Sequence, residues 1–482
     1  MLFNSNGFLI FLAVVLIVYY SLRSLRWQNM LLLVASYLFY AAWDWRFCFL
    51  LLITSVVDYF LGQSLADLPI GGRRQQALAI GLAINLGMLF FFKYFNFFVD
   101  SAVHGLNTLG INASPFTLAI ILPVGISFYT FQSIAYKMDV YRGIQKPERD
   151  PLIMGLFTGY FPQLVAGPIE RGSHVLPQFR RRSPATREQI ESGIVLILIG
   201  LFRKVVIADV AASLINAQVF TTPDTAPAGR VLMGIYLYAL QIYGDFAGYS
   251  DISRGVSRLF GIELVENFNQ PYFATSIADF WRRWHISLSN WLRDYIFMPL
   301  SRSLLRRFGN QYASAIVVVS HLVTMTISGL WHGANWTFVI WGFMHGVLLG
   351  GHRLIQNQRI LPIKVSSSLG KRILALISII VTFHVVAITW VFFRAPTLEV
   401  AFGVLQRALI DLRAHEIIFQ IGRPMALFSI LFLLDGLQVH YRDHTAIRRL
   451  PLVLRSLVYV LMGYGISLFW SNISAPFIYA KF

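Results

Sequence analysis

Long hydrophobic runs separated by short polar loops dominate this chain. A run of about 20 apolar residues is long enough for a helix to cross the hydrocarbon core of a bilayer. A window of that length marks candidate spans at roughly 7–20, 30–42, 47–62, 77–99, 116–136, 190–216, 230–250, 312–330, 337–352, 373–393, 424–440 and 456–472. The pattern predicts an all-α polytopic integral membrane protein with about 11 or 12 transmembrane helices. No linker or shift in composition divides residues 1–482, so we expect a single membrane domain.

Residues 151–189 do not fit a simple membrane span. Gly159, Pro162, Gly167 and Pro168 interrupt the apolar sequence, and a basic stretch follows them. Glycine and proline at this density break helices. Irregular backbone at membrane depth is tolerated only where protein or water covers it. We therefore expect a re-entrant segment here.

Residues 269–310 show the pattern of an amphipathic helical region. Apolar and aromatic positions recur at spacings of three and four residues, at Trp281, Trp284, His285, Leu288, Trp291, Leu292 and Tyr295. Such spacing places all of these side chains on one face of a helix. Arg282, Ser289 and Arg293 fall on the other face, and Asp279 and Arg283 are spaced as an i,i+4 ion pair. His285 is thus expected on the buried, aromatic face.

The composition supports a membrane setting. Hydrophobic residues make up 56% of the chain and charged residues 13%, whereas a soluble protein carries about 25% charged residues. The net charge is +17, and the basic residues fall in short loops between apolar runs. This distribution suits binding to an anionic membrane face better than binding to nucleic acid. A single cysteine, Cys48, excludes an internal disulfide and a multi-cysteine metal site. No Walker A or dinucleotide-binding glycine pattern stands in a strand–helix context.

The loops alternate in charge, which predicts the orientation of the chain. Lys and Arg gather in one set, at Arg23/Arg26, Arg73/Arg74, Lys137/Arg142/Lys146/Arg149, Arg302/Arg306/Arg307, Arg353/Arg359/Lys364/Lys371/Arg372 and Arg442/Arg448/Arg449/Arg455. Loops 100–115 and 217–229 contain almost none. By the positive-inside rule the basic set is cytoplasmic and both termini lie outside. Loop 394–423, with its four arginines, is an exception. The N-terminus lacks the charged region and cleavage site of a signal peptide.

Two histidines are candidates for proton chemistry in the membrane. His332 lies between Trp331 and Trp336 and is flanked by Gly329 and Gly333. Ionisable side chains are expensive in hydrocarbon, so one that persists there is a functional candidate. The two glycines remove side chains beside His332, and we expect them to open room for a substrate. His285 alone is more simply explained as a hydrogen-bonded core residue, and the tryptophan stripe as an interfacial anchor.

Several motifs, all in the same order, resemble those of a known family. They are Leu31–Tyr37, Leu122–Tyr129, Asp139–Gly143, Ala166–Pro168, Gly248–Asp251, Glu266–Tyr272, Phe280–Ser289, Trp291–Tyr295 and Gly329–Thr337. The chain resembles the membrane-bound O-acyltransferase (MBOAT) family over nearly its whole length, and specifically the bacterial branch that contains the membrane subunit of alginate O-acetylation.

The resemblance implies a fold, a reaction and site residues. His332 matches the family histidine that is essential for acyl transfer, and His285 matches its supporting histidine. The implied activity is O-acetylation of an extracytoplasmic surface polysaccharide from cytoplasmic acetyl-CoA, with no bound cofactor or metal. A periplasmic partner of the SGNH-hydrolase-like type is implied as well, as is a place in the bacterial inner membrane.

A mechanism follows from this chemistry. Acyl transfer from a thioester to a hydroxyl needs a general base, and the pKa of histidine suits that role. We expect His332 to be the base, while His285 orients it, receives the proton or hydrogen-bonds the acyl carbonyl. The phosphates of acetyl-CoA call for a basic cytoplasmic mouth. The candidate residues are Arg282, Arg283, Arg293, Arg302, Arg306 and Arg307. Alternatively, the 302–307 cluster only faces anionic lipid and sets the topology.

Two other functions remain open at this stage. A related acyltransferase passes D-alanine from a carrier protein to teichoic acid. A secondary transporter also has many spans, broken helices and buried ionisable residues. Transporters commonly contain internal repeats, but the patterns around His285 and His332 have no second copy in this chain.

Overall fold

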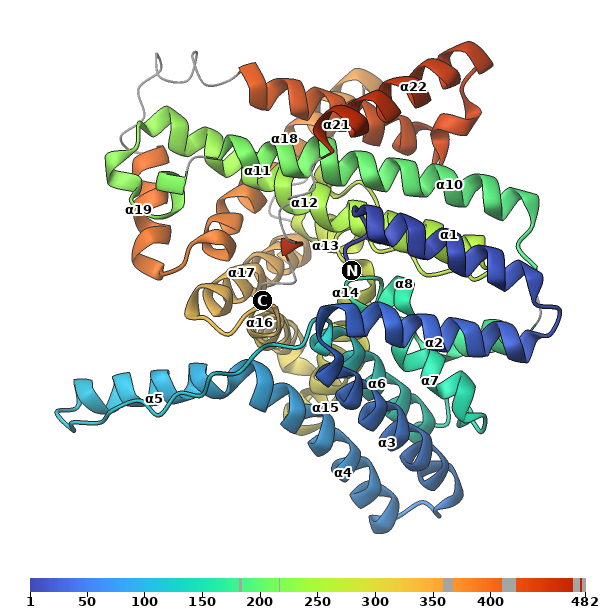
Figure 1. The fold of residues 1–482 in the computed structure, drawn as a ribbon. Helices are drawn as coiled ribbons and strands as arrows, with labels where there is room; N and C mark the ends of the chain where they lie inside the picture. The colour runs from blue at the N-terminus through green and yellow to red at the C-terminus, as the bar shows by residue number, and fades with distance from the viewer. Residues whose placement is uncertain (182–183, 216, 359–366, 410–421, 471–476, 479–482) are drawn as a thin grey trace. The chain divides into compact units, whose positions relative to one another are not determined.

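The computed structural model describes residues 1–181, 184–215, 217–358, 367–409, 422–470 and 477–478. Every regular element in these residues is a helix, which confirms the all-α class (Figure 1). Some of the basic positions used to predict the orientation lie outside the described residues, namely Arg359, Lys364 and Arg413. The chain forms two compact units, and helix α12 (Ala228–Leu259) contributes to both.

The first unit comprises Met1–Ile197 and Asp251–Val265. Its helices are α1 (Asn6–Ser21), α2 (Leu25–Asp44), α3 (Cys48–Asp67), α4 (Gly72–Leu89), α5 (Phe95–Thr108), α6 (Ile126–Tyr141), α7 (Pro151–Gly159), α8 (Phe161–Leu164), α9 (Gly172–Arg180) and the first part of α10 (Arg187–Leu201). Each long helix follows one of the hydrophobic runs of the sequence, because a run of apolar residues buries its backbone polar groups only by forming helical hydrogen bonds.

The second unit comprises Leu198–Ser250 and Glu266–Phe482. Besides most of α12, it contains α11 (Val210–Leu214), α13 (Ile277–Arg283), α14 (Ile286–Leu292), α15 (Met298–Phe308), α16 (Ala313–His332), α17 (Trp336–Gln358), α18 (Ser368–Arg394), α19 (Leu398–Leu409), α21 (Gly422–Tyr441) and α22 (Leu452–Phe469). Two π-helical stretches are part of it, η3 (Phe202–Asp209) and η7 (Arg293–Phe297).

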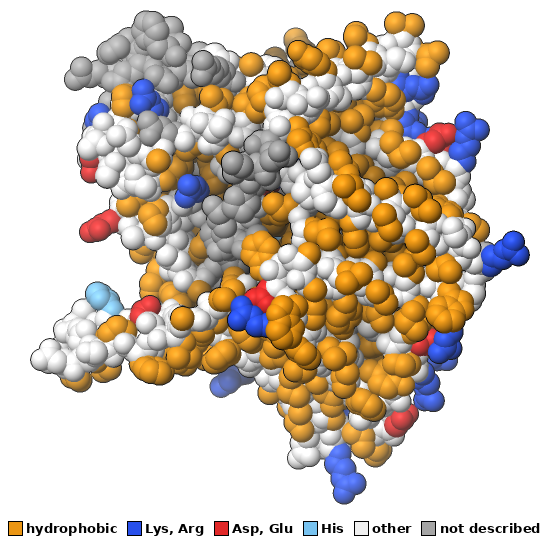
Figure 2. All heavy atoms as spheres, in the orientation of Figure 1, with side chains coloured by type: hydrophobic (Ala, Val, Ile, Leu, Met, Phe, Trp, Pro, Cys, Tyr) orange, Lys and Arg blue, Asp and Glu red, His pale blue; other side chains and the backbone are white. Residues whose placement is uncertain are grey.

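Seven helical stretches among the described residues are long and apolar enough to cross a membrane. They are Leu25–Asp67, Gly72–Thr108, Asn310–His332, Trp336–Gln356, Ser368–Arg394, Pro424–Tyr441 and Leu452–Phe469. Leu25–Asp67 runs through both α2 and α3, and α1 is apolar but shorter. Large hydrophobic side chains are exposed along these helices (Figure 2), as expected where lipid is the solvent. One of these seven stretches, Leu25–Asp67, contains two of the expected 11 or 12 spans, 30–42 and 47–62.

The expected span 116–136 shows where the prediction of a helix was wrong. Residues 111–123 have no regular structure, and α6 begins only at Ile126. Gly125 precedes that helix with φ +78°, in the left-handed region that favours glycine. A Cβ at Gly125 would also overlap the carbonyl oxygen of Leu164. The apolar residues before Gly125 therefore lead into a tight, glycine-dependent helix start instead of continuing a helix.

Residues 151–180 form three short helices, and most residues of 153–170 are buried. α7 ends at Gly159, and α8 begins after one residue, Tyr160. The side chains of Phe157, Tyr160 and Phe161 are fully buried in the first unit. Arg182, from the basic stretch that follows, lies outside the described residues. Entry of this segment into a membrane stays a prediction.

A buried polar cluster ties α3, α4 and α6 together in the first unit. The Lys137 ammonium donates to the carboxylate of Asp58 and to the Ser133 hydroxyl. Ser133 donates in turn to Asp58 (2.6 Å) and accepts from the Asn85 amide (2.9 Å). Asp58 and Lys137 have no exposed side-chain surface. Gly81 makes this possible, because a Cβ there would overlap the methylene stem of Lys137. Buried charges need such pairing to offset their desolvation.

Candidate functional site

His332 is the last residue of α16. The helix ends because Gly333 has extended backbone angles, and Asn335 then caps α17 by accepting a hydrogen bond from the Thr337 N–H at 2.9 Å. The His332 side chain is 2% exposed. Aromatic rings surround it, with centroids 4.9 Å away for Trp331, 5.1 Å for Trp341 and 5.2 Å for Phe393. The imidazole thus lies in an aromatic cage.

The glycines beside His332 allow close helix packing instead of opening room for a substrate. A Cβ at Gly329 would overlap the carbonyl oxygen of Phe338, and a Cβ at Gly333 would overlap the Phe338 ring. The space that these glycines leave is filled by α17, not left open for a substrate. The expectation of an access route at this point was wrong, because sequence alone does not reveal which neighbour fills the space beside a glycine.

A row of glycines on α17 extends the same close approach. Gly342, Gly346 and Gly350 face α16, where their added Cβ atoms would meet Met325, Leu322 and Val318. α16 and α17 therefore lie side by side with their backbones nearly in contact (Figure 1). Small residues at every fourth position are typical of tightly packed membrane helices.

His285 lies at a break between two short helices. α13 ends at Arg283, Trp284 is extended, and His285 has φ +43° and ψ +55° before α14 begins. The expected continuous helical face over 281–295 was wrong in this respect. The burial that it predicted is nevertheless confirmed for six of its seven positions, since Trp281, Trp284, His285, Leu288, Trp291 and Leu292 are buried. Asp279 and Arg283 form the expected ion pair at 3.1 Å.

The left-handed conformation of His285 is held by the loop that precedes α13. The Ile286 N–H donates to the Asn267 carbonyl at 2.9 Å, and the Ser287 N–H donates to Asn267 Oδ1 at 3.3 Å. Nδ1 of His285 is 3.1 Å from the same side-chain oxygen. A non-glycine residue in this region is strained and persists only when its surroundings fix it. Its position is thus set by tertiary hydrogen bonds.

The two predicted site histidines lie close together within the second unit. Their ring centroids are 6.3 Å apart, with 60° between the ring planes. The His285 side chain is fully buried, and its ring makes a T-shaped contact with Phe246 at a centroid distance of 4.7 Å. This burial lowers the pKa of His285, which lies outside the spanning helices, to about 3. The imidazole of His285 is therefore neutral at pH 7.

A third buried histidine, His345 on α17, was not predicted. Its Nδ1 accepts from the indole N–H of Trp281 at 3.2 Å, and its Nε2 is 3.0 Å from the Thr389 hydroxyl. Trp341 lies between it and His332, with its ring centroid 4.8 Å from that of His345 and 5.1 Å from that of His332. The one signal in the sequence was a histidine flanked by two of the spaced glycines, Gly342 and Gly346.

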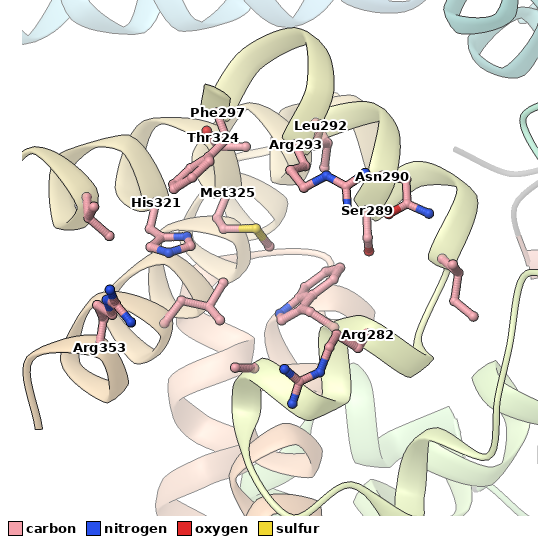
Figure 3. A pocket seen from close by; sticks show the side chains of 15 residues that line it. Arg282, Ser289, Asn290, Leu292, Arg293, Phe297, His321, Thr324, Met325 and Arg353 are labelled. Atoms are coloured by element: carbon pink, nitrogen blue, oxygen red, sulfur yellow. The ribbon is translucent and has the colours of Figure 1, made fainter. Parts of the chain in front are cut away.

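The predicted donor-binding arginines fall into separate places. Arg282 and Arg293 line a cavity of about 530 Å³ together with Arg353 and His321 (Figure 3). Its body is apolar, formed by residues that include Phe297 and Met325. Arg283 instead lines a smaller polar cavity of about 340 Å³ beside Arg442 and His444. The residues of the remaining cluster are exposed on α15 and line neither cavity: Arg302, Arg306 and Arg307.

The larger cavity lies along α16, and neither His332 nor His285 is among the residues that line it. Thr324 and Met325 line it, and Met325 precedes His332 by seven residues, a rise of about 10 Å along a helix. None of the described residues that line it is acidic. Its basic rim and apolar body match an amphiphilic molecule that carries phosphate.

Comparison with known proteins places these features in a family. Residues 152–393 match the model of the MBOAT, membrane-bound O-acyltransferase family. The chain is 38% identical over 426 residues to the probable alginate O-acetylase AlgI of Pseudomonas aeruginosa, a match that covers 88% of this chain and 75% of that protein. It is 35% identical over 438 residues to the peptidoglycan O-acetyltransferase of Helicobacter pylori, covering 84% and 79%.

A more distant similarity reaches one of the alternatives raised by the sequence. The teichoic acid D-alanyltransferase of Bacillus subtilis is 28% identical over 271 residues, which covers 55% of this chain and 66% of that protein. All of these relatives are named as acyl-transferring enzymes, which removes the secondary-transporter alternative. This chain, a multi-pass membrane protein and an O-acyltransferase, belongs to the membrane-bound O-acyltransferase family.

Proposed function

We propose that this enzyme takes an acetyl group from cytoplasmic acetyl-CoA and passes it across the inner membrane for O-acetylation of an extracytoplasmic polysaccharide. The observation that carries the proposal is the pair of buried histidines, 6.3 Å apart, in a chain whose similarity to alginate O-acetylases covers 88% of its length. D-alanyl transfer is less well supported, since the similarity to those enzymes covers 55% of the chain.

His332 is the general base in this proposal. Its imidazole takes the proton of the attacking hydroxyl as the new C–O bond forms at the thioester carbonyl. The C–S bond then breaks, and the proton passes to the departing thiolate, so that the products are the ester and free CoA. The aromatic cage leaves the His332 side chain 2% exposed, and limited access of water would protect the thioester from hydrolysis.

The proposal is tested with the purified enzyme in proteoliposomes. Acetyl-CoA carrying a labelled acetyl group is supplied on one face, and an acceptor polysaccharide on the other. A periplasmic SGNH-hydrolase-like partner is added on the acceptor side, and we expect labelled ester on the acceptor that depends on both proteins. D-alanine transferred from a carrier protein, with no transfer from acetyl-CoA, would support the alternative.

The donor is proposed to enter the larger cavity of the second unit. Its apolar body accommodates the thioester-bearing arm, and the exposed Arg282, Arg293 and Arg353 at its rim face the phosphates. A phosphate contact far from the thioester binds the ground state and the transition state alike. These arginines should therefore determine the affinity for the donor more than the rate of transfer.

Replacing Arg282 and Arg293 together with glutamine is expected to raise the apparent KM for acetyl-CoA roughly tenfold, at about 0.7 kcal/mol for each exposed contact. The maximal rate should fall less. The triple replacement of Arg302, Arg306 and Arg307 removes more charge, but outside the cavity, and should raise KM less. Initial rates in one lipid and one salt concentration measure both. An unchanged KM in the double variant would exclude this cavity as the donor site.

The orientation is proposed from the alternation of charge in the loops, with both termini extracytoplasmic. Single cysteines placed at Asn107 and Thr222, after replacement of Cys48 by serine, should react with an impermeant maleimide added to intact cells. A cysteine at Ser303 should react only after lysis. All three positions are exposed, so burial would not explain a lack of reaction. Labelling of the Ser303 position in intact cells would reverse the orientation.

A further inference from the structure

We propose that Asn267 is a positioning residue that holds neutral His285 in the tautomer with its proton on Nδ1, so that Nε2 is a proton acceptor. The catalytic role of this tautomer rests on the proposed acyl transfer. The hydrogen bonds that fix the tautomer do not involve a substrate. It also narrows the possible roles of His285, which the sequence left open.

The orientation of the Asn267 side chain follows from its other partners. A backbone N–H can only donate, and that of Ser287 points at Oδ1 (3.3 Å). The Ser287 hydroxyl also lies on this oxygen, at 2.9 Å. On the other side, Nδ2 donates to the Ser250 hydroxyl at 3.3 Å. Turning the amide over would set its NH₂ group against the Ser287 N–H, and the oxygen atom is therefore the atom that faces His285.

The tautomer of His285 then follows by elimination. A carbonyl oxygen only accepts, so the 3.1 Å contact with Nδ1 is a hydrogen bond that the imidazole donates. A neutral imidazole carries one N–H, which leaves Nε2 with a lone pair. Full burial disfavours the charged ring. Neutral His285 therefore accepts a proton or a hydrogen bond through Nε2, and it has no N–H left with which to stabilise an acyl oxyanion.

His345 shows the opposite arrangement and supports the distinction. Its Nδ1 accepts from the Trp281 indole, which can only donate, so its proton lies on Nε2. That N–H faces the Thr389 hydroxyl, which donates onward to the Val386 carbonyl at 2.7 Å. Both nitrogens of His345 are used by the protein, as expected for a structural histidine. In His285 the proton lies instead on Nδ1, and the proton-accepting atom is Nε2.

The groups packed against the His285 ring are the other influences on its protonation state. The rings packed on it come from α12, the 266–269 loop and α16, and are those of Phe246, Phe268, Trp331 and His332. His332 is the titratable member of this group, with its ring centroid 6.3 Å from that of His285. A carboxylate in place of the Asn267 amide would favour the charged ring and raise the pKa of His285.

The tautomer can be read without any assay of activity. The detergent-purified enzyme is labelled with ¹⁵N-histidine, and the signals of His285 are identified among the 11 histidines by their loss in H285Q. We expect a protonated Nδ1 and an unprotonated Nε2. A protonated Nε2 would overturn the proposal. Because no acyl donor or acceptor is present, this outcome is independent of whether the proposed function is correct.

Two replacements then test the positioning role in turnover. N267A should lower kcat roughly 10²-fold with little change in KM, whereas N269A, which alters an exposed asparagine of the same loop, serves as the matched control. N267D keeps the bond to Nδ1 but raises the pKa of His285, so the acidic limb of its rate–pH profile should move to higher pH. A wild-type kcat in N267A, or an N267D profile that coincides with wild type, would contradict the proposal. If N267A does not accumulate in the membrane, the N267D profile decides alone.

Discussion

Replacing His332 with alanine is expected to lower the rate of acyl transfer by about 10²–10⁴-fold, the contribution typical of a general base. The protein should still accumulate in the membrane, because the helices around His332 are joined by backbone-close glycine contacts that the replacement leaves intact. The measurement is the turnover of purified enzyme with acetyl-CoA, together with the acetyl content of the surface glycan.

A matched control for this experiment is His384→Ala on α18. His384 is exposed, and its Nδ1 lies 2.7 Å from the carbonyl oxygen of Ile380 on its own helix, so its loss should leave turnover unchanged. Wild-type acetylation in His332→Ala would end the assignment of His332 as the base. A loss of protein equal to the loss of activity would show instead that His332 is needed for folding.

The second large effect is expected at the buried ion pair of the first unit. Lys137→Met leaves the Asp58 carboxylate buried beside Ser133 with no cation, and breaking one side of such a pair costs about 3–5 kcal/mol. The unfolding temperature of the detergent-solubilised protein should fall sharply. The double variant Asp58→Leu, Lys137→Met removes both charges and should recover most of this loss.

An exposed pair provides the comparison. Arg187 and Glu191 are 2.7 Å apart with side chains 93% and 45% exposed, and Arg187→Met should change stability by less than about 0.5 kcal/mol. If the double variant at Asp58 and Lys137 is as unstable as Lys137→Met alone, the pair stabilises the fold by more than the neutralisation of one buried charge by the other. In that case the hydrogen bonds that Ser133 makes would be the principal source of stability.

Hydrophobic runs predicted helices well where one apolar stretch forms one helix. The expected span 373–393 lies within Ser368–Arg394, and all of 47–62 except its first residue lies within Cys48–Asp67. The prediction failed at 116–136 because hydropathy does not register the left-handed turn at Gly125. The expected span 190–216 is largely helical but is not among the seven apolar stretches, because its helix carries several charged residues. Arg203 pairs with Asp435 at 2.6 Å within the second unit, a partner far away in the sequence that composition cannot reveal.

The sequence predicted which residues of the site are buried, but not the backbone conformation and hydrogen bonds that position them. Side-chain spacing reports which residues are buried, so the burial of Trp281 and His285 could be inferred from their positions. The break at His285 could not, because Asn267, 18 residues earlier, determines that conformation. His345 was missed for a similar reason. A histidine inside an apolar run has no distinguishing mark until its partners, here Trp281 and Thr389, are known.

The glycine row of α17 also constrains how His332 can move. Its members repeat every four residues, a rise of about 6 Å, and each accommodates one side chain or turn of α16. Sliding of one helix along the other by less than a full turn would drive side chains into backbone. The two helices should therefore respond to a thicker or thinner bilayer by tilting together. The depth of His332 in the membrane would change, but its register against Trp341 would not.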